Sequence, residues 1–181
     1  MQSILLSALL QIAVIPSAPE IQRAHDWAHQ SLTEGSSIPF SFVLTGTSSA
    51  KFLSTWTRKA ISGTAMDTPI SRIESFHDPV TGLEVRIAMV QYKDLPAVEW
   101  VVYLKNTSSQ DTPIIEAIQP LDITLPKIEG DPILHYAKGA TCSMEDFRPM
   151  PRVLNCGAKA SFQPVGGSSS SAFLPFFNLE T

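Results

Sequence analysis

Apolar residues recur at every second position in two neighbouring stretches, and this alternation constrains the fold more than any other feature of the chain. The first stretch runs from Leu83 to Met89 and the second from Val98 to Leu104. Successive side chains of a β-strand point to opposite faces, so each stretch predicts a strand with one apolar face. The opposite face carries Glu84, Arg86, Glu99 and Lys105. This face is either solvated or a binding surface, because any one-sided sheet shows half-polar alternation.

Turn residues flank both stretches. The segment from His77 to Gly82 contains Pro79, which restricts φ, and Gly82, which tolerates a positive φ. It therefore predicts that residues 70–76 pair back antiparallel with the first stretch. A second turn over residues 93–96 joins the two stretches, which predicts a three-stranded meander over residues 70–106.

The rest of the chain is also predicted to be mostly β. Further strands are expected at 39–44, 56–61, 114–125, 133–138, 158–163 and 172–179. Residues 21–32 carry apolar side chains at helical spacing, which predicts a short amphipathic helix. Many strands separated by Pro, Gly, Asp and Asn predict an all-β fold, a large antiparallel β-sandwich with a short N-terminal helix.

The first eighteen residues have the pattern of a signal peptide. Residues 4–15 are apolar apart from Ser7 and Gln11, and small residues follow up to Ala18. This stretch is too short to span a bilayer, and no Lys or Arg precedes it. We therefore predict a signal peptide at 1–18, a β domain at 19–181, and a secreted or periplasmic protein. The alternative is an N-terminal helix packed on the core of a cytoplasmic protein.

Charge and motif content exclude several classes of function. The chain has 13 Lys and Arg against 17 Asp and Glu, so it lacks the positive surface that nucleic-acid binding requires. No nucleotide-binding loop or nucleophile-elbow motif occurs, and we predict no cofactor, no metal and no catalytic residue. His25 and His29 lie four residues apart on the predicted helix, where a solvated face explains them better than a metal site.

One segment combines polar groups with an aromatic ring. A predicted strand at 133–138 runs into a loop, and together they hold His135, Lys138, Asp146 and Phe147. Sugar sites use hydrogen-bonding groups for hydroxyls and an apolar ring against the C–H face of the sugar. These four residues are therefore our candidates for sugar contact. The alternative is a loop whose Lys138 and Asp146 form a surface ion pair and whose Phe147 anchors it to the core.

The two cysteines, Cys142 and Cys156, are too few for a disulfide scaffold. In an exported protein they are candidates for a single bridge, and free buried thiols are the alternative.

A succession of short motifs resembles the N-terminal region of α-galactosidase-like glycoside hydrolases, those of family 36 and their relatives. The similarity covers nearly all of the chain from Ile21 onward. The motifs that carry it are Pro39–Val43, Thr81–Val85, Pro96–Asn106, Asp111–Ile115, Ile118–Asp122, His135–Gly139, Cys142–Phe147 and Leu174–Glu180.

The resemblance implies an architecture and a role. Such enzymes have an N-terminal β-supersandwich of the galactose-mutarotase-like kind, then a (β/α)₈ barrel with two catalytic Asp, then a smaller β domain. No residue here matches the catalytic motifs of the barrel, and the apolar run Ser171–Glu180 stands where the family continues toward the barrel. We therefore expect a non-catalytic part of a larger glycoside hydrolase, inactive alone, whose partners are a catalytic barrel and a galactoside. The loop before Phe147 would lean over the sugar site.

Two other functions fit the same sequence. The chain could act as a stand-alone carbohydrate-binding module, or as a structural and interaction domain whose apolar residues 173–177 dock another chain. Exposed apolar strands seek partners, so the last of these also allows an oligomer.

Overall fold

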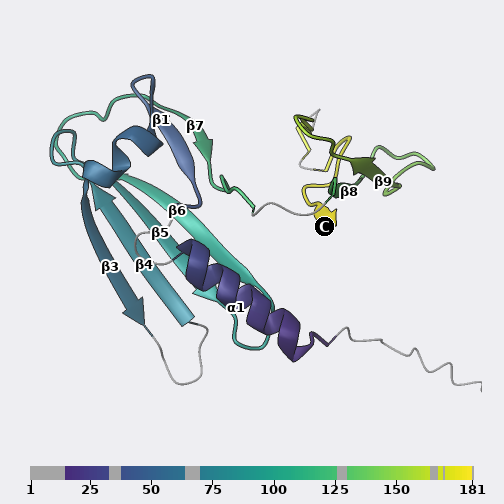
Figure 1. Ribbon diagram of the computed structural model, residues 1–181. Coiled ribbons are helices and arrows are strands. Elements are labelled where there is room, and N and C mark those ends of the chain that lie inside the picture. Colours follow the sequence, from purple (N-terminus) through teal and green to yellow (C-terminus); the bar gives the residue numbers. More distant parts are fainter. Residues whose placement is uncertain are drawn as a thin grey trace, which may run out of the picture. The chain divides into compact units, whose positions relative to one another are not determined.

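The computed structural model describes residues 15–32, 38–63, 70–125, 130–163, 167–168 and 170–180. It contains three antiparallel sheets and one short helix near the N-terminus, so the predicted all-β, sandwich-like class is confirmed (Figure 1). Most of the predicted signal peptide, residues 1–14, lies outside the described residues.

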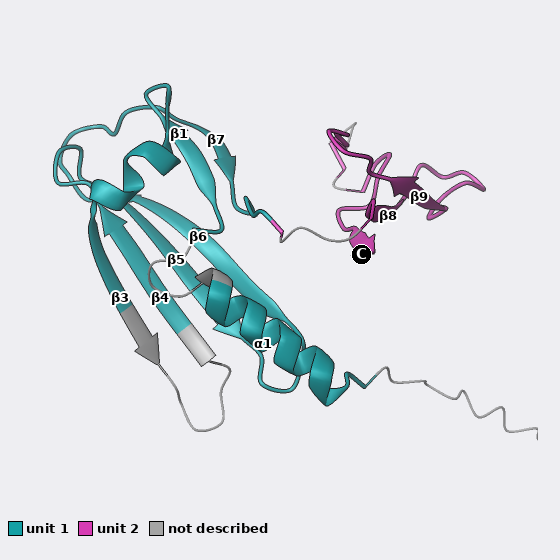
Figure 2. Ribbon diagram, in the orientation of Figure 1, with its two compact units in different colours: residues 1–124 teal, residues 125–181 magenta. Residues whose placement is uncertain are grey.

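The chain divides into two compact units, residues 1–124 and 125–181 (Figure 2). The sequence predicted one β domain over 19–181. The division follows from strand pairing: in the described part of the chain, the strands after residue 124 pair only with one another.

A four-stranded antiparallel sheet forms the frame of the first unit. Its order is β3–β4–β5–β6, and these strands are Thr57–Gly63, Ile70–His77, Leu83–Gln91 and Val98–Asn106. In its register Phe76 lies opposite Val85, and Val85 lies opposite Leu104. The predicted meander over residues 70–106 is therefore confirmed, and β3 extends it by one strand.

The core of the first unit lies on one face of this sheet. Helix α1, Ala18–Leu32, contributes the buried Ala28, and it lies across the sheet in Figure 1. Strand β5 contributes its alternate residues, all buried: Leu83, Val85, Ile87 and Met89. The apolar residues that alternate along β5 in the sequence are therefore the ones on the core face, because every second side chain of a strand points to the same side.

A small sheet packs over the same core. Its order is β2–β1–β7, with strands Thr47–Ser48, Ser41–Leu44 and Ile115–Gln119. Two short 3-10 helices, η1 at Ser49–Lys51 and η2 at Leu53–Thr55, follow β2. The ring of Phe40 lies 6.5 Å from that of Phe76 in an edge-on arrangement, which joins the two layers. Buried Ser49 accepts a 3.2 Å hydrogen bond at its hydroxyl from the backbone N–H of Phe42.

The core face also contains a buried carboxylate. Glu74 accepts hydrogen bonds from Arg58 at 2.7 and 3.2 Å, and it forms an ion pair with Arg72. The Arg58 guanidinium lies 5.5 Å from the centre of the Phe76 ring. A buried charge needs such partners, because an unpaired carboxylate away from water is costly.

The second unit is built on a three-stranded sheet of order β10–β8–β9. The strands are β8, Ile133–Ala137; β9, Pro149–Val153; and β10, Asn178–Glu180. Strand β8 confirms the prediction at 133–138, whereas β9 was not predicted, because it contains Pro149 and Pro151. On either side of β9, the N–H of Lys138 donates to the carbonyl of Arg148, and the N–H of Leu154 donates to that of Pro132. The backbone N–H and C=O groups of the even-numbered residues of β9 therefore point toward β8. Those of Pro149 and Pro151 point toward the free edge, where a missing N–H costs little.

Three strand predictions differ from the structure. Of residues 114–125, only 115–119 form a strand, β7. Residues 158–163 form no strand, and of 172–179 only the last two belong to β10. Residues before β10 make a single bridge, between Phe173 and Lys138. Ala172 has a φ of 69°, and Pro175 lacks an N–H, so neither residue continues a ladder.

Candidate functional site

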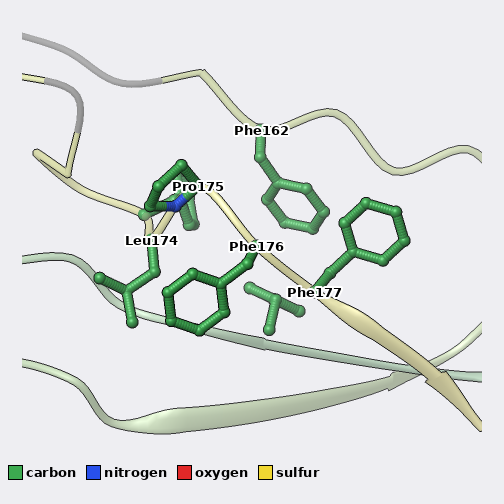
Figure 3. Close-up of a pocket in the computed structure, with 7 residues that line it drawn as sticks. Phe162, Leu174, Pro175, Phe176 and Phe177 are labelled. Carbon is green, nitrogen blue, oxygen red and sulfur yellow. The ribbon is translucent and has the colours of Figure 1, made fainter. Parts of the chain in front are cut away.

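An apolar pocket of about 270 Å³ lies within the second unit. Tyr136 of β8 and Phe162 line it, together with the segment from Phe173 to Phe177. Figure 3 shows that Phe162 comes from a different stretch of chain than Leu174 to Phe177. None of the lining residues is charged, so the pocket offers aromatic and aliphatic surface rather than ionic groups.

Three of the pocket aromatics pack on one another. The Tyr136 and Phe162 ring centres are 4.4 Å apart, and the Phe162 and Phe173 centres are 5.1 Å apart with an angle of 62° between the rings. Such offset and edge-on contacts are favourable for aromatic rings. Phe176 and Phe177 are instead 65% and 62% exposed, so their surfaces are open to a ligand or a partner.

Backbone hydrogen bonds hold the pocket segment against the end of β8. The N–H of Gly139 donates to the carbonyl of Ala172 at 3.0 Å, and the N–H of Leu174 donates to that of Ala137 at 3.1 Å. A Cβ on Gly139 would lie only 1.6 Å from the carbonyl oxygen of Ser170. Only glycine therefore allows this approach of the two chain segments.

The loop after β8 is organised around Asp146. Its carboxylate accepts hydrogen bonds from the backbone N–H and hydroxyl of Thr141, both at 2.9 Å, and from the N–H and hydroxyl of Ser143 at 3.1 and 3.2 Å. The backbone N–H of Thr141 above all, with the other three donors, lowers the pKa of Asp146 to about 2. The same four hydrogen bonds stabilise the ionised form of Asp146 and hold Thr141 and Ser143 in place, so the carboxylate orders the loop that contains it.

The other predicted contact residues lie around this loop. Lys138 lies 3.9 Å from Glu145, which also pairs with Arg148 at 2.6 Å, so the lysine pairs with Glu145 rather than with Asp146, the partner that the alternative predicted. Hydrogen bonding from Arg148 lowers the pKa of Glu145. Phe147 has a φ of 61° and is 60% exposed, so it does not anchor the loop in a core.

His135 is paired across the sheet with a residue far along the chain. Its Nε2 lies 2.6 Å from Oε2 of Glu180 on the neighbouring strand β10. None of the four predicted residues lines the aromatic pocket. Lys138 forms a bridge with Phe173 of the pocket segment, and His135 lies beside β10, the strand that follows this segment. The pocket itself was missed. Its aromatic run was visible in the sequence but was interpreted as a strand, and Phe162 was assigned to a strand as well.

The cysteines and the paired histidines of α1 have simple surroundings. Cys142 and Cys156 are both free and exposed, so the structure has neither the bridge nor the buried thiols that the sequence left open. His25 Nε2 lies 3.0 Å from the carbonyl oxygen of Tyr92, a contact that joins α1 to the segment after β5. Within the described ranges, no three His, Cys, Asp or Glu side chains gather where they could hold a metal ion.

The described residues include no helix with the length and apolar character to cross a membrane. Comparison of the chain with protein-family models, with curated proteins and with solved structures found no match.

Proposed function

We propose that this chain is a non-catalytic β module of an α-galactosidase-like glycoside hydrolase, which supports a catalytic barrel supplied by another segment or chain. The observation that carries the proposal is the aromatic pocket of the second unit, whose wall contains no carboxylate. Glycoside hydrolysis uses two carboxyl groups about 5 to 9.5 Å apart. The pocket therefore has surface for a sugar ring but lacks the groups that cleave it.

Two further observations agree with this role. The motif succession from Pro39 to Glu180 resembles the N-terminal region of these enzymes, and the antiparallel sheets agree with the β-rich domain that the resemblance implies. Asp146, a carboxylate of the predicted sugar loop, uses its oxygens for four hydrogen bonds within that loop. A carboxylate held ionised at neutral pH is a poor general acid.

Turnover of an aryl α-galactoside tests the proposal directly. We expect no hydrolysis by the pure polypeptide, and hydrolysis when the corresponding catalytic barrel is supplied with it. Hydrolysis by this polypeptide alone that disappears in Asp146→Ala would overturn the proposal, because the chain would then contain its own catalytic carboxylate.

A second candidate is a stand-alone carbohydrate-binding module. The pocket favours it, because all of its lining residues lie between Tyr136 and Phe177 and thus within one unit. The C–H face of a sugar ring packs well on exposed aromatic side chains such as Phe176 and Phe177.

Calorimetric titration with galactose and galacto-oligosaccharides separates the two candidates. Saturable binding that is lost in Phe177→Ala but kept in Phe147→Ala supports the binding module. Phe147 is a matched control, since it is as exposed as Phe177 but does not line the pocket. The reverse pattern would place the contact in the loop that the sequence predicted, and a flat trace would eliminate the module.

A further inference from the structure

The face of the four-stranded sheet opposite the core is exposed and partly apolar. We call this the outer face. It consists of the alternate residues of three strands that point away from α1 and the small sheet. They are Ile73, Ser75 and His77 of β4; Glu84, Arg86, Ala88 and Val90 of β5; and Glu99, Val101, Tyr103 and Lys105 of β6. Ile73 is 38% exposed, Val101 is 52% exposed and Tyr103 is 44% exposed. The described residues of the first unit place their helix and second sheet on the core face only.

The apolar residues form a row across the middle of the outer face. In the register of the sheet, Ile73 lies opposite Ala88, and Ala88 lies opposite Val101. The next row contains Arg86 opposite Tyr103, with the guanidinium 4.5 Å from the ring centre. These two rows make a broad, level surface, because an arginine stacked on a tyrosine adds planar contact area.

On β6 the charges are placed symmetrically about these rows. Along β6 the outward residues are, in order, Glu99, Val101, Tyr103 and Lys105. A two-fold axis that lies above the outer face, parallel to the sheet and perpendicular to its strands, and passes over β6 between Val101 and Tyr103, puts Glu99 opposite Lys105 of a second copy. It puts Val101 opposite Tyr103 of that copy in the same way. The outward row of β6 is therefore complementary to itself, which is the requirement for a two-fold symmetric interface.

We propose that the outer face is a homodimer interface, with a second copy of this chain as its occupant. Sheets pack face to face about 10 Å apart, a gap that Val, Tyr, Glu and Lys side chains span from both sides. With strands about 4.8 Å apart and a rise of about 3.3 Å per residue, the three strands of the outer face cover about 430 Å². Two such faces bury on the order of 850 Å², in the range of weak and transient interfaces. The dimer is therefore weak and dissociates on dilution.

Charge reversal combined with sedimentation analysis of the full chain tests this interface. Between about 1 µM and 1 mM, a range typical of weak complexes, we expect a reversible monomer–dimer equilibrium. Glu99→Lys and Lys105→Glu should each weaken dimerisation about tenfold or more, because each places like charges opposite one another twice. The double variant Glu99→Lys/Lys105→Glu should recover it. Lys51→Glu, which reverses an exposed charge of η1 outside the outer face, is the matched control and should have no effect.

Two further variants guard against indirect effects. Val101→Arg places a charge in the apolar row and should leave only monomer. Glu99 accepts a hydrogen bond from Tyr92, which raises the pKa of that phenol. Glu99→Gln keeps an acceptor for Tyr92 and removes the charge, so it should weaken the dimer less than Glu99→Lys. Unchanged tryptophan fluorescence would show that each variant still folds.

Several outcomes would overturn the proposal. The wild-type chain could remain monomeric throughout the concentration range, which would include the case in which another part of the same chain covers the face. The dimer could also persist in Val101→Arg and Glu99→Lys, which would place its interface elsewhere. Failure of the double variant to recover dimerisation would exclude the two-fold arrangement.

Discussion

Replacing Gly139 with alanine tests how the pocket segment is held. The added Cβ would lie 1.6 Å from the Ser170 carbonyl oxygen and 2.9 Å from the Phe173 nitrogen. Both contacts are with backbone atoms, so no side-chain rotation relieves them. The φ of Gly139 is outside the left-handed region, so the effect of the substitution is steric alone. We therefore expect residues 170–173 to move away from the end of β8.

The magnitude follows from the hydrogen bonds that this movement breaks. Three are at stake: Gly139 to Ala172 at 3.0 Å, Ala140 to Ser170 at 3.0 Å, and Leu174 to Ala137 at 3.1 Å. At about 1 kcal/mol for each, the free energy of opening this region should fall by about 3 kcal/mol. Since a factor of ten corresponds to about 1.4 kcal/mol, the amides of residues 139, 140 and 174 should exchange about a hundredfold faster.

Hydrogen exchange followed by mass spectrometry measures this change in the full chain. Tryptophan fluorescence supplies a report on the other unit, because Trp27, Trp56 and Trp100 all lie before residue 125. We expect faster exchange around residue 139 and an unchanged tryptophan signal.

Gly157→Ala is the matched control for the added methyl group. Gly157 has a φ of 78°, but a Cβ there meets no atom within 4 Å. Its substitution should cost only the left-handed strain, about 1 kcal/mol. If Gly139→Ala leaves exchange at residues 139, 140 and 174 unchanged, or perturbs the unit no more than Gly157→Ala, the close approach of the two segments is refuted.

Three further predictions concern titration and buried polar groups. The pKa of Asp146 in the folded chain is about 2, below its ordinary value of 3.8, so the carboxylate stabilises the loop above pH 4 and this stabilisation is lost as the pH falls through about 2. Carboxyl NMR titration and amide exchange in the loop should both show this midpoint. A midpoint near 4 would contradict the prediction. Glu74→Gln leaves Arg58 and Arg72 without their buried anion and should lower the unfolding free energy of the first unit by about 3 kcal/mol. Urea unfolding followed by tryptophan fluorescence measures this loss. An unchanged midpoint would mean that the arginines find other partners. Ser49→Ala leaves the Phe42 N–H unpaired in the core and should lower the unfolding free energy by about 1 to 3 kcal/mol in the same assay. An unchanged unfolding free energy would mean that this N–H has another hydrogen-bond acceptor.

Local sequence patterns were enough to predict most of the first unit. The alternation around Val85 and Val102 identifies both the strands and the face that is buried, because the two-residue period depends only on backbone geometry. The turn before Gly82 could also be predicted from the sequence. In the structure Asp78 accepts a 3.0 Å hydrogen bond from the Val80 N–H, and Gly82 has a φ of 72°. Both features depend only on residues a few positions apart in the chain.

The second unit was harder to predict, because its contacts join distant residues. Pro149 and Pro151 argue against a strand until β8 is known to lie on only one side of them. The aromatic run before β10 looks like a strand until Ala172 is found in the left-handed region. In each case the deciding quantity is the position of a neighbour that no local pattern contains.

The same distinction separates the predicted sugar loop from the observed pocket. Residue types alone were sufficient to single out Asp146 and His135 as polar groups beside an aromatic ring. Only the tertiary structure assigned the oxygens of Asp146 to its own loop, joined His135 to Glu180, and gathered Phe162 with Phe173 into one wall. Periodicity along the chain determines which side of a strand is apolar, whereas the packing of segments tens of residues apart determines which polar groups are already used and which aromatic surfaces stay open.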